Sequence, residues 1–214
     1  ISSFYPAVCY GGPIFSTLNL SKSLVSLGVD LKIITTDVNC TEKLDVVKNK
    51  FIKVEGLWVK FFGLTLSYKY AFSFMQLLFF WRDIKKTDVQ YINNIFTFGV
   101  PIGLIYSKIF NKPNILAPRG VLGEWAMSNG SKHKKLWLRI FIKPFANSIF
   151  WHATSEQEKQ EILSHFPNAR VVIIPNGVNV DEFKKSNILT KKEYLIKYIN
   201  KDVENIDKII VSMG

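Results

Sequence analysis

Two adjacent glycines and a proline, Gly11-Gly12-Pro13, stand directly before a stretch with the apolar spacing of an α-helix. Proline is tolerated in a first helical turn because the amide hydrogen that it lacks would have no intrahelical partner there. Glycine lets a backbone approach a ligand closely, and the N–H groups at a helix N-terminus attract phosphates. The segment therefore predicts either a tight turn or a backbone cradle for an anion, and alone it is more typical of a turn.

Other polar residues that could bind such a ligand follow short β-rich runs. Arg119 lies in a Pro-Arg-Gly segment, and its guanidinium fork suits a phosphate or a carboxylate. Pairing of Arg119 with a local acid such as Glu124 is nearly as well supported. Asn176 and Gly177 form an Asn-Gly pair, for which simple turn chemistry is the stronger interpretation.

Several well-defined catalytic and nucleotide-binding motifs are missing from the sequence. The glycine pair lacks the third glycine of the dinucleotide-binding motif G-x-G-x-x-G, and no G-x-x-x-x-G-K-[ST] loop is present. There is no G-x-S-x-G elbow, H-E-x-x-H motif or Cys/His cluster, and the three histidines are scattered (His133, His152 and His165). These absences argue against a dinucleotide dehydrogenase, and a lone histidine is usually structural.

The composition is that of a folded protein with an excess of positive charge. The chain has 214 residues, of which 48% are hydrophobic, and its formal net charge is +11. That charge favours an anionic partner: nucleic acid, an acidic membrane surface or a phosphorylated ligand. The single pair of cysteines, Cys9 and Cys40, favours a reducing compartment. No signal peptide is visible at the start, and the most apolar stretch, 70–81, is too short to span a bilayer.

Short β-rich runs alternate with helical patterns along the whole chain. The sequence predicts strands at 1–4, 29–37, 58–63, 89–96, 114–120, 148–155, 170–177 and 207–214. It predicts helices near 13–27, 70–85, 99–110, 132–143, 155–165 and 190–200. Ser155 is expected to cap the helix at 155–165, with Glu158 completing a capping box. The expected fold is α/β: a Rossmann-like parallel sheet with helices on both faces.

Glycine, asparagine and small polar residues recur just after these strands. In an open parallel sheet such positions share the carboxyl edge, where ligands bind. We therefore expect the loops that carry Gly11, Gly12, Asn93, Arg119 and Glu124 to converge on one edge. Two long irregular stretches, about 37–56 and 118–131, are typical of functional or mobile loops.

Four segments together resemble the N-terminal half of a group 1 (family 4) glycosyltransferase with the GT-B fold. They are SSFYP…YGGP, LAPRGVLGEWA, HATSEQEKQEI and VVIIPNGVNVDEF, in that order. The resemblance implies two Rossmann-like domains that face each other across a cleft. It implies an acceptor-binding domain at 1–186, followed at 187–214 by an interdomain segment and the first strand of a truncated C-terminal domain.

The family implies transfer of a sugar from a nucleotide-sugar to a hydroxyl with retention, without a metal or a cofactor. Its E-x7-E carboxylates lie in the C-terminal domain, so we expect no catalytic residue on this chain and no activity from it alone. By resemblance, Gly11 and Gly12 line the cleft near the donor phosphates and the acceptor. Glu124 could accept hydrogen bonds from sugar hydroxyls, although a surface role is equally consistent with the sequence.

One segment departs from the family pattern. Many relatives carry an H-x-H-G-type segment after the fourth strand, and here Tyr91 stands at the first histidine, Asn93 at the second and Asn94 at the glycine. Asparagine can orient a hydroxyl but cannot shuttle a proton near neutral pH. The sequence therefore argues against acid–base help from a histidine at this position.

A basic helix is predicted at 132–143, inside a stretch without acidic residues. Helical spacing gathers four cations on one face (Lys132, Lys135, Arg139 and Lys143) and four apolar residues on the other (Leu136, Trp137, Ile140 and Phe141). Such a face suits an anionic membrane surface. The alternative is an ordinary solvated face, and most aromatic residues of the chain are expected in the core.

The leading hypothesis is the acceptor-side domain of a glycosyltransferase that builds a surface polysaccharide on a lipid carrier. Its expected partners are a nucleotide-sugar donor, a glycan or lipid-linked acceptor and an anionic membrane, and its expected location is cytoplasmic, peripheral at the inner face of the cell membrane. Nucleic acid is not an expected partner, because no binding motif accompanies the charge. The alternative is a non-catalytic Rossmann-like module that uses its basic face for nucleic acid or membrane.

Overall fold

The computed structural model describes residues 3–128, 131–177 and 193. Residues 1–177 form one compact unit. The predicted helix at 190–200, the strand at 207–214 and the domain boundary at 186 lie outside the described residues, so these three remain predictions.

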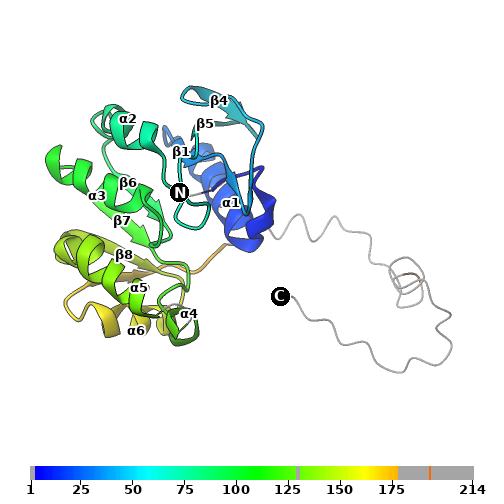
Figure 1. The fold of residues 1–214 in the computed structure, drawn as a ribbon. Coiled ribbons are helices and arrows are strands. Elements are labelled where there is room, and N and C mark those ends of the chain that lie inside the picture. The colour runs from blue at the N-terminus through cyan, green and yellow to red at the C-terminus, as the bar shows by residue number, and fades with distance from the viewer. Residues whose placement is uncertain (1–2, 129–130, 178–192, 194–214) are drawn as a thin grey trace. The chain divides into compact units, whose positions relative to one another are not determined.

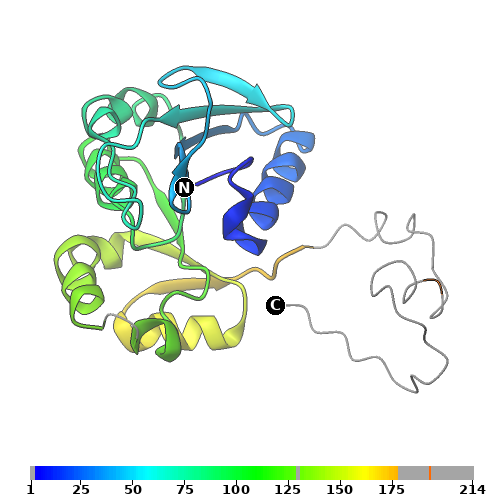
Figure 2. The ribbon, with the colours of Figure 1, turned by 45° about the vertical axis from the view of Figure 1, so that its right-hand side comes forward.

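A four-stranded parallel sheet forms one half of this unit. Its strands pair side by side in chain order, β6 (Gln90–Asn93), β7 (Asn114–Ala117), β8 (Ile149–Ala153) and β9 (Arg170–Ile173). Parallel neighbours need crossover connections, and these contain α3 (Gly99–Ile109), α5 (Ser131–Trp137) and α6 (Glu156–His165). These helices flank the strands in both views (Figures 1 and 2). The predicted Rossmann-like α/β class is confirmed, and each of these four strands ends a few residues before its predicted limit.

The other half contains a smaller mixed sheet, where the sequence predicted only parallel strands. Strand β5 (Leu57–Phe62) pairs in parallel with β1 (Lys32–Thr36) and antiparallel with β4 (Phe51–Val54). Glu55 and Gly56 join β4 to β5 with φ values of 52° and 81°, the two positive angles of a type I′ hairpin. The stretch 37–56 is thus not irregular throughout.

A small hairpin and two more helices complete the first half. The hairpin pairs β2 (Val38–Asn39) with β3 (Glu42–Lys43). Helix α1 (Gly12–Ser26) follows the short helix η1 (Val8–Tyr10). Helix α2 (Phe74–Ile84) packs against α3, and Ser73 caps its N-terminus by accepting a hydrogen bond from the Gln76 N–H.

No strand forms at residues 3 and 4, so the strand predicted at 1–4 is wrong for the part that the structure describes. The chain turns there instead, because the Ala7 N–H donates to the Phe4 carbonyl at 2.9 Å. Phe4 is nevertheless fully buried, in a cluster with Leu18 and Ile33. Phe4 is therefore part of the core, but it lies in a turn and not in a strand.

The predicted basic helix at 132–143 is not one α-helix. Helix α5 continues into a π-helix, η2 (Leu138–Ile142), which is followed by a 3-10 helix, η3 (Lys143–Ser148). Pro144 lies in the first turn of η3. Trp137 is buried against the ring of Phe98, with centroids 5.0 Å apart, and donates its indole N–H to the Ile95 carbonyl at 3.0 Å.

This anchoring of Trp137 changes which residues of the segment reach the surface. All four predicted cations are exposed (Lys132, Lys135, Arg139 and Lys143). Leu136 and Ile140 were predicted to face inward with Trp137, but they are 54% and 51% exposed. They lie one residue before Trp137 and Phe141, which pack on each other with centroids 4.6 Å apart and fix the inward direction. The exposed face is therefore both basic and aliphatic.

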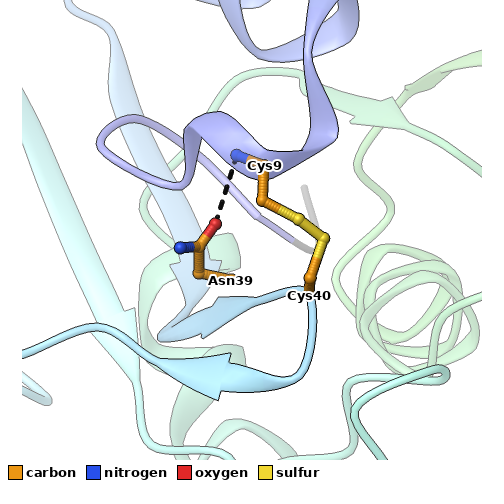
Figure 3. The surroundings of a disulfide bond; sticks show 3 residues. All are labelled: Cys9, Asn39 and Cys40. Atoms are coloured by element: carbon orange, nitrogen blue, oxygen red, sulfur yellow. Dashed lines mark hydrogen bonds between the residues drawn. A yellow bond between two sulfur atoms is a disulfide. The ribbon is translucent and has the colours of Figure 1, made fainter.

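Cys9 and Cys40 form a disulfide, with their Cα atoms 6.1 Å apart (Figure 3). The Cys9 N–H also donates to the side-chain oxygen of Asn39 at 3.3 Å. The disulfide ties η1, just before α1, to the hairpin of β2 and β3. A single pair of cysteines favours a reducing compartment only if both thiols are free, and here they are bonded to each other, so that expectation loses its support.

Candidate functional site

A pocket of about 550 Å³ opens where the loops that follow β7, β8 and β9 meet the start of α1. Gly12 contributes from the start of α1, and Arg119 and Gly120 contribute from the loop after β7. Thr154 follows β8, Glu158 lies in the first turn of α6, and Asn176 lies in the segment after β9. The carboxyl edge of the sheet and a helix N-terminus thus share one hollow.

The glycine pair has two different backbone conformations at the entrance to α1. Gly11 has a φ of 63°, which favours glycine, and its N–H donates to the Val8 carbonyl at 2.9 Å. Gly12 begins the helix, and a Cβ atom built on it would meet no other atom within 4 Å. Gly12 therefore gives a ligand access to the first turn of α1, whereas Gly11 makes the turn that precedes it.

Arg119 is held by three neutral oxygen atoms. Its Nε donates to Asn93 Oδ1 at 3.0 Å, its Nη1 to Asn176 Oδ1 at 2.7 Å and its Nη2 to the Tyr91 hydroxyl at 3.1 Å. The alternative pairing with Glu124 is not observed. A guanidinium has five N–H donors, so two of them remain for a ligand after these three bonds. The fork is fixed in place, and within residues 3–128 and 131–177 no carboxylate forms a direct ion pair with it.

Tyr91 connects Arg119 to a buried histidine. The Tyr91 hydroxyl lies 2.5 Å from His152 Nδ1, and His152 Nε2 lies 2.7 Å from the Ile174 carbonyl. Because a carbonyl can only accept, Nε2 carries a proton, and in this tautomer Nδ1 accepts from the Tyr91 hydroxyl. Burial raises the pKa of the Tyr91 phenol against the opposing charge of Arg119, and the Glu158 charge raises it further. Tyr91 therefore remains a neutral donor to His152 while it accepts from Arg119.

Glu158 is the acidic residue that the pocket holds most tightly, with only 4% of its surface exposed. One carboxylate oxygen accepts from the Gly120 N–H at 2.8 Å, and the other from the N–H and the hydroxyl of Thr154, both at 2.7 Å. Burial opposes ionisation, but these hydrogen bonds and the Arg119 charge outweigh it and hold the pKa of Glu158 below its usual value. Glu158 therefore fixes the loop of Arg119 to the start of α6.

The capping box predicted at this helix is half correct. Ser155 caps α6 by accepting from the Glu158 N–H at 3.2 Å, as predicted. The Glu158 carboxylate does not return to the Ser155 N–H, as a capping box requires, and bonds Thr154 and Gly120 instead.

Asn94 uses its side chain on its own turn. It has a φ of 72°, and its Oδ1 accepts from the N–H groups of Ile95 and Phe96 at 2.6 and 3.2 Å. Asparagine tolerates this left-handed conformation better than most residues, so it can occupy the position at which the resemblance led us to expect glycine. Asn93, by contrast, is buried and points to Arg119.

Two of the predicted site residues, Glu124 and Gly177, do not line the pocket that contains Arg119. Glu124, the first residue of α4 (Glu124–Ser128), lines an adjoining pocket and not the one that Arg119 lines. Gly177 is exposed and is the last residue of the compact unit. The structure therefore brings together Gly12, Asn93, Arg119 and Asn176, and separates Glu124.

Sequence reasoning missed three residues of this site. Tyr91 was noted only as a departure from the family histidine, His152 only as a scattered histidine and Glu158 only as a helix cap. The available signal was positional, since Tyr91 and His152 lie in strands of the parallel sheet and Glu158 lies in the first turn of the helix that follows β8.

Neither a metal site nor a membrane span is visible in the described part of the chain. Within residues 3–128 and 131–177, no three His, Cys, Asp or Glu side chains gather closely enough to hold a metal ion. Within the same residues, no helix has the length and apolarity that crossing a bilayer requires.

Comparison with known proteins identifies the family. The family model for glycosyltransferase family 4 matches residues 10–182, which is more than half of the chain. A comparison with curated proteins found no match. The matched range contains α1, both larger sheets and every residue that lines the pocket at Arg119. The chain belongs to glycosyltransferase family 4.

Proposed function

We propose that this chain is the acceptor-side domain of a retaining glycosyltransferase that takes its sugar from a nucleotide-sugar and adds it to a lipid-linked glycan. The full protein would work in surface polysaccharide synthesis at the cell membrane. The carboxylates that act on the donor would belong to a second domain, so this chain alone would transfer no sugar. Its own task would be to bind and orient a phosphate-bearing substrate.

The observation that carries the proposal is the fixed and unneutralised guanidinium of Arg119. Asn93, Asn176 and Tyr91 take three of its donors, and the two others remain for the pocket. The first turn of α1 borders the same pocket at Gly12 and adds partial positive charge. A phosphate between them would receive two-pronged hydrogen bonds and the field of the helix terminus.

Titration of this chain with inorganic pyrophosphate, followed by calorimetry, tests the anion site. Arg119→Gln should weaken binding at least tenfold, because a charge-assisted bond of about 1.5 to 3 kcal/mol is lost. Gly12→Ala should weaken it similarly by placing a methyl group in the pocket, without backbone strain. Arg82→Gln removes an exposed arginine on α2 and should change nothing. Equal affinities in all four proteins would refute the phosphate site.

A lipid-linked acceptor would bring the protein to a membrane, and the exposed face of α5, η2 and η3 is the part suited to meet it. Four cations and two aliphatic side chains are exposed together there (Lys132, Lys135, Leu136, Arg139, Ile140 and Lys143). Each cation near an anionic bilayer contributes about 1 kcal/mol. Changing the four cations to glutamate should therefore weaken binding to phosphatidylglycerol vesicles by about 10³-fold or more, in a salt-dependent way. Equal binding of the native chain to anionic and neutral vesicles would refute this surface.

A further inference from the structure

A second pocket, of about 600 Å³, adjoins the first along helix α6. Gln157 and Glu161 line both pockets, so these two side chains form the border that the pockets share. The opposite wall comes from α4 and α5, through Glu124, Met127 and Lys135. Figure 1 shows these three helices grouped at one end of the compact unit. The second pocket is therefore a groove between α6 and α4 that lies next to the anion site.

The wall that α6 contributes is polar along its whole length. Gln157, Gln160, Glu161 and Ser164 are spaced i, i+3, i+4 and i+7, which places them on one face of the helix. Seven residues of helix extend about 10 Å, more than the width of one sugar ring. Amide and carboxylate groups at this spacing offer donors and acceptors in alternation, as the hydroxyl groups of a saccharide require.

The floor of the second pocket is apolar, and an exposed aromatic residue follows one of its lining residues in the chain. Leu122 and Met127 line it and are 2% and 5% exposed. Trp125 follows Glu124 on α4 and is 81% exposed, the largest exposed fraction among the large apolar residues of the described part. A flat ring without a protein partner beside polar groups is suited to stack on the apolar face of a sugar.

Glu161 is built into the junction of the two pockets. Gln157 Nε2 donates to Glu161 Oε1 at 3.0 Å. A Cβ atom at Gly123 would lie only 3.0 Å from the same oxygen, so the glycine lets the carboxylate lie close to the start of α4. Glu161 is thus held, together with Gln157, at the border that the two pockets share.

We propose that this groove is a second saccharide subsite, which holds the sugar residues that precede the reacting end of an oligosaccharide acceptor. The proposal rests on the proposed function and adds to it that the acceptor is a glycan of at least two sugars, bound along α6. The reacting end would lie at Arg119, and the preceding sugars would lie between α4 and α6 with one ring on Trp125.

The charges of the second pocket favour a neutral polyol over a second anion. Glu124 and Glu161 oppose the single cation Lys135 among its lining side chains. A phosphate would meet net repulsion there, in contrast to the pocket at Arg119. An extended saccharide uses carboxylates well, because two neighbouring hydroxyls can donate to one of them.

The test measures affinity against acceptor length with the intact chain. A panel of defined oligosaccharides of two, four and six sugars is titrated, with two-dimensional NMR as the readout. For those that bind, the native chain should bind the tetrasaccharide about tenfold more tightly than the matching disaccharide. Trp125→Ala and Glu161→Gln should each remove this gain. Trp58→Ala, which removes an exposed tryptophan on β5, should preserve it.

Three outcomes would overturn the proposal: no saccharide of the panel binds, affinity does not rise with length, or the gain survives both variants. A loss of vesicle binding in Trp125→Ala with unchanged saccharide binding would also overturn it, and would assign the ring to the membrane surface. Pyrophosphate titration of the same variants keeps the two proposals apart. Trp125→Ala should bind pyrophosphate like the native chain, so failure of the length effect beside intact, Arg119-dependent pyrophosphate binding rejects the subsite alone.

Discussion

Replacing the buried carboxylate of Glu158 by an amide should destabilise the protein by breaking one specific hydrogen bond. In Glu158→Gln the side-chain oxygen can face either the Gly120 N–H or the Thr154 N–H, which now bond to different carboxylate oxygens. The amide nitrogen then faces the other N–H, and two donors cannot pair. Whichever way the amide turns, one backbone N–H loses its acceptor.

The expected loss is about 2 to 4 kcal/mol of unfolding free energy. An unpaired buried donor costs about 1 to 3 kcal/mol, and the bonds that survive weaken by roughly 1 kcal/mol because their acceptor has lost its charge. Urea unfolding followed by circular dichroism measures this directly. Glu156→Gln is the matched control, because that residue lies on the same helix and is exposed, so its change should leave stability nearly unaffected.

The same substitution should also change how stability depends on pH. The pKa of Glu158 is lowered in the folded chain, so its stabilising contribution is complete above the ordinary carboxyl pKa of 4.5 and is lost as pH falls through the folded value. The native chain should therefore lose stability below about pH 4.5 more steeply than Glu158→Gln. Parallel pH profiles, or a loss in Glu158→Gln no larger than in Glu156→Gln, would refute the account of this carboxylate.

Three further substitutions test other contacts around the site. Gly11→Ala should cost about 1 to 2 kcal/mol of unfolding free energy, because an L-residue is forced to a φ of 63°. If urea unfolding gives Gly11→Ala the same free energy of unfolding as Gly12→Ala, this reasoning is contradicted. Cys9→Ser should lower the free energy of unfolding by up to about 4 kcal/mol, the loop-closure value for a separation of 31 residues. Thiol titration of the unsubstituted protein in denaturant should detect no free thiol unless reductant is added. Tyr91→Phe should cost about 1 to 3 kcal/mol by leaving His152 Nδ1 without its donor, and should weaken pyrophosphate binding in the calorimetric assay, whereas unchanged values would show that Tyr91 does not position Arg119.

The alternation of apolar strands with helices was enough to predict the parallel sheet, because each strand buried on both faces leaves a continuous apolar run in the sequence. Strand β4 escaped prediction for a local reason. Glu55-Gly56 makes its hairpin turn with two positive φ values, yet type I′ turns are recognised by Asn-Gly or Asp-Gly. Glutamate at the first position carries no such signal, so the stretch looked irregular.

The outward position of Leu136 and Ile140 depends on contacts that Trp137 makes with residues distant in the sequence. Periodicity grouped them with Trp137 and Phe141 as one apolar side. The rings of Phe98 and Tyr70 select Trp137 as the inward residue, with centroids 5.0 and 5.6 Å from it. Helical periodicity predicts that some apolar face is buried, but the partner decides which residues at its edge remain in solvent.

The contacts of Glu158 and Arg119 show why the sequence could place these loops at one edge of the sheet but could not predict which side chains bond to each other there. Local pattern assigned the Glu158 carboxylate to its own helix, whereas it bonds Gly120, 38 residues earlier. Had Glu158 paired directly with Arg119, the guanidinium would be neutralised and the pocket would attract no anion. Instead both carboxylate oxygens bond Gly120 and Thr154, and neutral oxygens hold Arg119. The positive charge therefore remains available on the side of Gly12, and the negative charge repels a ligand from the side of α6, so an anion has one favourable position in the pocket.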